Sequence, residues 1–308
     1  MAGITNRGKA LLLKLFFQGI EDPAGLSFFV ALGTNDTPPT ADSNTLADVS
    51  QIATGNGYTD GGLAVARDNV DWDVLTEDDV NDRALIQAID QVWTASGGSI
   101  PSGGNGARWA FLLTDEVTAS TRQIIAYWDL AFDRTISTGQ TLTLQNLELR
   151  LNGFLGMTNR GAYLLLQLYF QAVNPHGSFT GFYLALLDDA EAPNADWDTM
   201  TGRSEIPSGN GYTSGGIAVA RDNVDFDVLT EDDGNDRALV QIKDITWTAS
   251  GGNLPSAGNG ARYAVLLTDE ATVGSRQTIG TFDLGANWFA SSGQDLVLQD
   301  SELRINES

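Results

Sequence analysis

The amino-acid sequence contains the same unit twice, one copy after the other. The match is closest in the middle of the unit, where Ala64–Asp79 and Ala218–Asp233 agree at 15 of 16 positions. Nearer the start, the four residues Thr5–Gly8 recur as Thr158–Gly161. Copies this similar must be able to adopt one fold, and chemistry that belongs to the unit must appear in both. A residue found in only one copy is therefore a weak candidate for a shared active site.

The repeat predicts two domains, residues 1–152 and residues 153–308, with the joint near Leu151–Met157. A unit of about 150 residues can bury its own core, so residues 1–152 are expected to fold alone. The 308-residue chain has no cysteine, which excludes disulfide bonds and thiolate metal sites. Its longest apolar run, Ala10–Phe17, is too short to cross a bilayer, and no membrane partner is expected.

Each unit is expected to open with a helix. Thr5 and Asn6 are suitable N-caps for a helix over Arg7–Gln18, and Gly19 is suited to end it. An apolar stripe, which indicates a helix facing the core, recurs in both units. The stripe consists of Leu11, Leu12, Leu15 and Phe16, and of Leu164, Leu165, Leu168 and Tyr169.

The rest of each unit alternates short β-rich runs with glycine, proline and aspartate, which is typical of antiparallel β-structure. The expected strands are Leu26–Gly33, Gly62–Arg67, Ala84–Thr94, Gly106–Thr114, Arg122–Leu130 and Thr141–Leu151, with equivalents in the second unit. A change of phase between Leu144 and Leu147 suggests a bulge in the last strand. The sequence therefore predicts a mainly β protein with two tandem antiparallel β-sandwich domains, each with an N-terminal α-helix.

The chain is strongly acidic, and its two halves share the charge. Residues 1–153 carry 9 Lys/Arg against 19 Asp/Glu, and residues 154–308 carry 8 against 21, so the halves contribute −10 and −13 to the net charge of −23. Such a surface repels phosphate backbones, and nucleic acid is not an expected partner. The acidity fits either an ordinary protein kept dispersed by self-repulsion or adaptation to high salt.

Three glycine-rich or acidic segments recur in both units. Gly55–Thr59 has the composition of a tight turn. Asp68–Asp82 is expected to be an acidic loop, either simply solvated or holding a structural calcium ion, because Ca²⁺ binds six to eight oxygen ligands. The third, Gly97–Gly106 with its copy Gly251–Gly260, is expected to be an exposed contact loop. The calcium candidates are Asp68, Asp71, Asp73, Asp222, Asp225 and Asp227.

Enzyme activity is not expected, because no catalytic set occurs in both units. His176 is the single histidine, and the corresponding segment of the first unit has none. A Ser-His-Asp arrangement is thus absent from the first unit, and a cysteine nucleophile from both. Aspartates are abundant enough for a glycosidase-type pair, but nothing singles one out. No catalytic residue and no cofactor is assigned.

The order of motifs resembles a known family. After the leucine-rich helix come an aromatic strand ending in Ala-Leu (Phe28–Leu32 and Phe182–Leu186), the Gly-Asn-Gly-Tyr-Thr turn and the Trp-Thr-Ala-Ser-Gly-Gly segment at Trp93–Gly98. Over nearly all of each unit, this order resembles small virion proteins of tailed bacteriophages and tailed archaeal viruses, the tail-fibre-like or head decoration proteins. Members usually carry one unit, so the tandem form departs from the pattern.

The resemblance implies a non-enzymatic role in the virion and transfers no catalytic residue. The expected function is that of a capsid decoration or cement protein on the outer head surface, which binds the major capsid protein or other virion proteins and self-associates. Alternatives are a neck, tail or fibre component, or a carbohydrate-binding β-sandwich. The opening helices and the glycine-rich loops Gly97–Gly106 and Gly251–Gly260 are the expected contact surfaces.

Overall fold

In the computed structural model, which describes residues 2–25, 27–152 and 156–306, the protein is mainly β, with antiparallel sheets and two α-helices. The first half contains β1 (Ala2–Ile4), α1 (Asn6–Gln18), β2 (Phe28–Gly33), β3 (Leu63–Val65), β4 (Val74–Asp78), β5 (Arg83–Ala88), β6 (Gln91–Thr94), β7 (Ala107–Leu113), β8 (Ile124–Arg134), β9 (Thr141–Leu144) and β10 (Leu147–Asn152). The second half contains α2 (Asn159–Gln171), β11 (Gly181–Leu187), β12 (Ile217–Ala220), β13 (Val228–Asp232), β14 (Arg237–Ile242), β15 (Ile245–Thr248), β16 (Ala261–Thr268), β17 (Thr278–Trp288), β18 (Asp295–Leu298) and β19 (Ser301–Ile305). Neither α-helix in the described ranges has the length and apolar character of a membrane span.

Helix α1 begins at Asn6, one residue before the predicted start at Arg7, and ends at Gln18. Thr5 is the N-cap, and its hydroxyl accepts a hydrogen bond from the amide of Gly8 at 2.9 Å. Gly19 follows the helix with φ 69°, the left-handed conformation that glycine adopts without strain. In α2 the equivalent position is Ala172, at φ 55°. The described part of each half thus contains one α-helix of 13 residues, α1 and α2.

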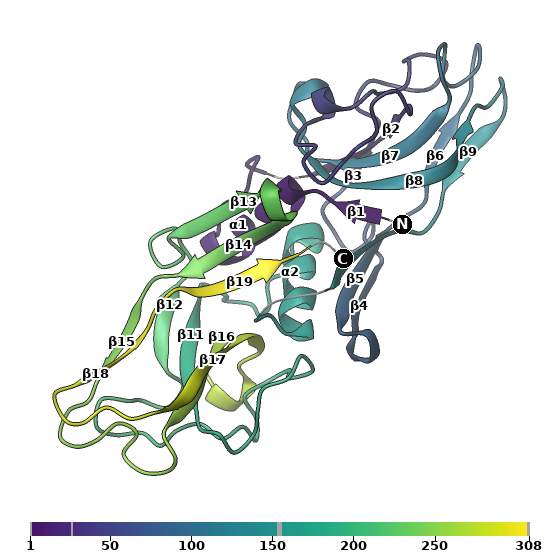
Figure 1. The fold of residues 1–308 in the computed structure, drawn as a ribbon. Coiled ribbons are helices and arrows are strands. Elements are labelled where there is room, and N and C mark those ends of the chain that lie inside the picture. The colour runs from purple at the N-terminus through teal and green to yellow at the C-terminus, as the bar shows by residue number, and fades with distance from the viewer. Residues whose placement is uncertain (1, 26, 153–155, 307–308) are drawn as a thin grey trace.

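The predicted strand Thr141–Leu151 is divided in two, and this division shapes each half. The chain turns at Asn146, where φ is 55°, between β9 and β10. β10 joins the three-stranded sheet β10-β5-β4, whereas β9 pairs with β6 as a separate ribbon. The predicted strand Ala84–Thr94 is likewise divided, into β5 and β6. In the second half the ribbon is β15-β18, and it extends away from the centre of the molecule (Figure 1).

The two helices lie at the centre of the molecule and are exchanged between the halves (Figure 1). Helix α1 packs against β13 and β14 of the second half, and α2 packs against β4 and β5 of the first. The start of each helix stays with its own half. The amide of Thr5 donates to the carbonyl of Ile125 in β8, and the amide of Thr158 donates to that of Ile279 in β17, each at 3.0 Å. Each helix is thus anchored on one half and covers the sheet of the other.

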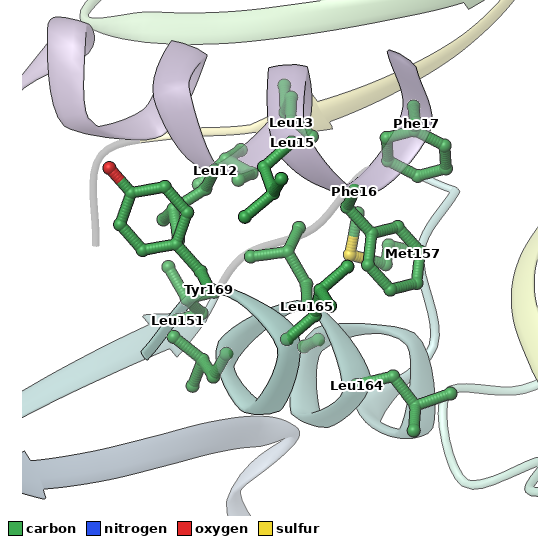
Figure 2. Close-up of a cluster of buried hydrophobic side chains, with 14 of the residues drawn as sticks. Leu12, Leu13, Leu15, Phe16, Phe17, Leu151, Met157, Leu164, Leu165 and Tyr169 are labelled. Atoms are coloured by element: carbon green, nitrogen blue, oxygen red, sulfur yellow. The ribbon is translucent and has the colours of Figure 1, made fainter. Parts of the chain in front are cut away.

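This exchange explains why α1 is buried on more than one face. Besides the predicted stripe, Leu13 and Phe17 are completely buried. Side chains of both helices fill the space between them, among them Leu15 and Phe16 of α1 and Leu165 of α2 (Figure 2). One cluster of buried residues contains members of both halves. A helix packed against a second helix and two β-layers needs apolar side chains nearly all round.

Reciprocal aromatic contacts fix the exchange. Phe17 of α1 packs on Phe182 and Phe226 of the second half, with ring centroids 5.5 and 5.0 Å apart. In the equivalent contact of the other helix, Phe170 of α2 packs on Trp72 of the first half, with ring centroids 4.4 Å apart. Aromatic pairs at such distances stabilise a fold beyond their area burial. The core of each half is therefore completed by rings from the other half.

The turn Gly55–Thr59 is structural, as the sequence predicts. Gly57 has φ 103°, and a β-carbon there would lie 2.2 Å from the carbonyl oxygen of Thr94. The buried hydroxyl of Tyr58 accepts a hydrogen bond from the amide of Leu32 at 2.9 Å. Only glycine permits this backbone conformation and this approach together.

Candidate interaction surfaces at the two tips

The glycine-rich loops lie at opposite ends of the molecule, beyond the ribbons β6-β9 and β15-β18 (Figure 1). In the first half, Ile100 of the loop and Ile136 exchange two backbone hydrogen bonds of 2.9 Å. In the second half, Leu254 and Ala290 do the same at 2.8 Å. We define the first tip by residues 34–37, 97–106 and 131–140, and the second tip by residues 188–191, 251–260 and 285–294.

Side-chain amides connect the loops within each tip. Asn105 donates to Asp36 at 2.7 Å in the first tip. In the second, Asn259 and Asn287 both donate to the carboxylate of Asp189, at 3.2 and 2.8 Å. These two hydrogen bonds lower the pKa of Asp189 below its usual range, so it stays ionised. The tips are therefore ordered loop clusters with fixed charges.

Large aromatic side chains are exposed at both tips. Phe132 is 69% exposed in the first tip, and Trp288 and Phe289 are 53% and 57% exposed in the second. Aromatic residues on a surface are typical of protein contacts, because they bury a large apolar area at small entropic cost. The aromatic positions differ between the halves, since Trp288 corresponds to Arg134 in the repeat. The two tips thus share a framework but present different chemistry.

A shallow hollow of about 240 Å³ adjoins the second tip. Trp288 forms one wall, and its indole donates to the carbonyl of Leu284 at 2.9 Å, which fixes the ring. Asp283 and Gln299 supply polar groups, and Arg262 pairs with Asp283 at 2.9 Å. In the first tip, the guanidinium of Arg134 lies over the Phe132 ring instead, 5.7 Å from its centre. The second tip thus combines a fixed aromatic wall with nearby polar groups.

The opening helices are not exposed contact surfaces, and that prediction is wrong. Leu11, Leu12 and Phe16 of α1 are buried in the centre of the molecule. The physical reason is the exchange, since each helix is needed to cover the three-stranded sheet of the other half. Of the two expected surfaces, only the glycine-rich loops are accessible to a partner.

The acidic segment Asp68–Asp82 is not a continuous loop, because Val74–Asp78 forms β4 at the edge of the three-stranded sheet. Asp68 accepts hydrogen bonds from the amides of Val70 and Asp71, both at 2.9 Å. Asp71 accepts one from Ala66 at 2.6 Å, and Asp73 is exposed. These carboxylates shape the turn before β4.

The copy of the acidic segment is arranged in the same way. Asp222 accepts from the amides of Val224 and Asp225 at 2.9 Å, which lowers the pKa of Asp222. Asp225 accepts from Ala220 and pairs with Lys243, and Asp227 is exposed. Within the described ranges, no three His, Asp or Glu side chains form a group that could hold a metal ion.

The sequence leaves two interpretations of the six aspartates open, a solvated acidic segment and a structural calcium site, and Ca²⁺ titration separates them. Because several of the oxygens already accept backbone hydrogen bonds, we expect millimolar Ca²⁺ to leave the melting temperature unchanged in molar NaCl. A specific site would add about 2.7 kcal/mol at a hundredfold excess over its Kd, which calorimetry resolves easily. A Ca²⁺-dependent rise that Asp71→Asn with Asp73→Asn abolishes would restore the calcium hypothesis.

Two ion pairs connect the halves, and sequence reasoning missed them. Glu77 of β4 pairs with Arg160 of α2 at 3.1 Å, and Glu231 of β13 pairs with Arg7 of α1 at 3.2 Å. Burial raises the pKa of Glu77 to about 7, with a further contribution from Asp198, against the opposing effect of Arg160. Burial likewise raises the pKa of Glu231. The sequence does show that these arginines and glutamates recur in both units, but recurrence does not tell which arginine pairs with which glutamate.

The raised pKa of Glu77 predicts a pH dependence of stability. The folded chain holds a proton on Glu77 up to about pH 7, whereas an unfolded glutamate releases it near 4.5. This contribution to the free energy of unfolding is therefore complete below about pH 4.5 and is lost as pH rises through 7. We expect urea unfolding of Glu77→Gln to show a flatter profile between these pH values than the unmodified chain. Parallel profiles would contradict the assignment.

His176, the single histidine of the chain, lies beside a carboxylate in the second half. Its imidazole lies 2.5 Å from the carboxylate of Asp269, which also accepts hydrogen bonds from the amides of Thr180 and Gly181 at 3.0 and 3.1 Å. These contacts hold the connection between α2 and β11.

Comparison with family models, curated proteins and solved structures finds no match to this chain.

Proposed function

We propose that this protein is a structural component of a virus particle: a two-ended decoration or cement protein that binds the outer surface of the head. In the virion, the chain would form a tandem of two antiparallel β-sandwich units, each with its N-terminal helix. Its partners would be the major capsid protein or other virion proteins. The observation that carries it is the pair of ordered tips with exposed aromatic residues at opposite ends of one molecule (Figure 1).

The arrangement of the tips favours binding at two places. Because both helices lie in a shared core, the separation of the tips is set by packing rather than by a linker. A rigid spacing increases the effective concentration of the second tip when it matches the spacing of the binding sites. A protein that joins two neighbouring subunits of a shell needs this property.

The polar groups with perturbed pKa values support a structural role rather than an enzymatic one. Glu77 and Glu231 pair with arginines across the contact between the halves. The buried hydroxyls of Tyr58 and Tyr212 accept hydrogen bonds from backbone amides at 2.9 and 3.0 Å, and burial raises the pKa of both. Each of these groups is used to hold the fold together, and we propose no catalytic activity.

A carbohydrate-binding module is the second candidate, and the hollow beside Trp288 favours it. A fixed aromatic wall with nearby carboxylate and amide groups is suited to a sugar ring. Such a module would fit a tail or fibre component, and a neck protein remains a further alternative within the virion. A glycan array separates these classes, because a cement protein should show no preference among sugars.

Replacing the tip aromatics is expected to weaken binding to particles. Central aromatic residues of an interface contribute about 2 kcal/mol or more, so Phe132→Ser and Phe289→Ser should each lower affinity at least roughly tenfold. Val80→Ser is the matched control, because Val80 is 92% exposed but lies outside the tips. Occupancy is measured by cryo-electron microscopy of particles titrated with each variant. Equal occupancy for all three variants, or binding to tails alone, would refute the decoration proposal.

A further inference from the structure

An arginine of each half donates hydrogen bonds to the C-terminal end of the other half's helix. The guanidinium of Arg221 donates to the carbonyls of Phe16 and Leu15 at 2.8 and 2.6 Å, at the C-terminal end of α1. Arg67 makes the same contacts with Tyr169 and Leu168 of α2, at 2.7 and 2.8 Å. The last carbonyls of a helix lack partners within the helix and carry partial negative charge, so a partly buried cation there is stabilising.

A second pair of contacts follows the same rule. Gln18 of α1 donates to the carbonyl of Phe226 at 2.9 Å, and Gln171 of α2 donates to that of Trp72 at 2.8 Å. Together with the two Arg–Glu pairs, every one of these contacts occurs twice, related by the repeat. Contacts of this reciprocal kind define a two-fold interface between equivalent units.

The residues that make these contacts are the same in both halves. Arg67 matches Arg221, Gln18 matches Gln171, and the Arg–Glu pairs use identical residue types. The acceptors of the arginine and glutamine groups are backbone carbonyls, which every sequence supplies. The receiving surface therefore has no feature among these contacts that distinguishes one helix from the other.

The chain on either side of the joint is held by its own half. β10, which ends at Asn152, pairs along its whole length with β5. On the other side, the carbonyl of Gly156 accepts a hydrogen bond from the amide of Thr281 in β17 at 2.6 Å, and Met157 forms an antiparallel β-bridge with Gly280. The reciprocal contacts between the halves involve none of these residues.

We infer that each unit carries a complete binding surface for a second copy of the same unit. The surface consists of the opening helix, given to the partner, and the three-stranded sheet, which receives the partner's helix. The tandem chain is then a helix-exchanged dimer made permanent by a peptide link. This inference is independent of the virion proposal, because it concerns only how the units recognise each other.

The first test cuts the link in the folded full-length protein. A flexible insert with a protease site is placed within residues 153–155, and cleavage is verified on a denaturing gel. We expect the two fragments to remain a 1:1 complex of unchanged mass at low micromolar concentration, as measured by light scattering. Elution as two separate fragments would overturn the inference.

The second test asks whether a unit accepts its own copy. The cut protein is unfolded in urea, refolded as the mixture and weighed by native mass spectrometry. Because the arginine, glutamine and Arg–Glu contacts use the same residue types in both directions, we expect homotypic pairs of each fragment beside the original heterotypic pair. The heterotypic pair should be favoured where the halves differ, at Trp72 against Phe226 and at Lys9, which donates to the carbonyl of Asp236, against Ala162. If only the heterotypic pair forms, the surface does distinguish the halves and the inference is wrong.

A matched set of arginine variants locates the surface. Arg67→Ala with Arg221→Ala removes the hydrogen bonds to the helix ends and should weaken association of the cut fragments at least about tenfold. Arg83→Ala with Arg237→Ala is the control, because these arginines pair with Asp78 and Asp232 of their own halves. If both double variants weaken fragment association equally, Arg67 and Arg221 have no special role in it.

Discussion

Replacing Phe170 by alanine is expected to destabilise the whole chain by about 3–5 kcal/mol, in a single unfolding transition. Phe170 is completely buried, and it packs on Trp72 and Phe28 of the other half at 4.4 and 5.2 Å. Its removal leaves a cavity in the core of the first half and detaches the end of α2. Because buried residues of both halves form one cluster, neither half should melt separately.

Fluorine NMR of the full chain labelled with 5-fluorotryptophan reports on the same contact. The signal of Trp72 is assigned with Trp72→Phe, which places at this position the residue that the second half has at Phe226. Below the unfolding transition, Phe170→Leu should shift the Trp72 signal, whereas Phe17→Leu should not, since Phe17 packs on Phe226. A shift with Phe17→Leu alone, or two separate calorimetric transitions, would mean that each helix packs within its own half.

Replacing Gly8 by alanine is expected to destabilise the protein, although alanine is the better helix former by about 1 kcal/mol. A β-carbon at Gly8 would lie 2.2 Å from the carbonyl oxygen of Ile125. That oxygen belongs to β8, which is paired on both sides and also accepts the amide of Thr5. The backbone cannot move away cheaply, so we expect a net loss of about 1–3 kcal/mol in urea unfolding.

Two further glycines show whether the close approach is the cause. Gly161→Ala should cost a similar amount, because its β-carbon would lie 2.3 Å from the carbonyl oxygen of Ile279. Gly103 has open space around it and an ordinary φ, so Gly103→Ala should change stability by less than about 0.5 kcal/mol. A rise in melting temperature for Gly8→Ala would refute the close packing of helix and strand.

The acidic segment shows where sequence patterns were misleading. Val74–Asp78 reads as part of a charged loop, because no residue of β4 is fully buried and the segment shows little alternation of apolar and polar residues. Glu77 in this strand nevertheless reaches Arg160 of the other half. Its role depends on a partner 83 positions away in the sequence, which no local pattern identifies.

The sequence by itself determined the repeat, the mainly β class and the glycine turns, because these depend on local spacing and conformational preference. The tertiary structure decided which helix covers which sheet. The two units are so alike that a helix packed on its own sheet and a helix packed on the other sheet satisfy the same apolar pattern. What separates them is the direction of the helix, set where Thr5 and Gly8 meet the backbone of Ile125 in β8. From that anchor α1 runs onto β13 and β14 of the other half, and this direction is a property of three-dimensional packing alone.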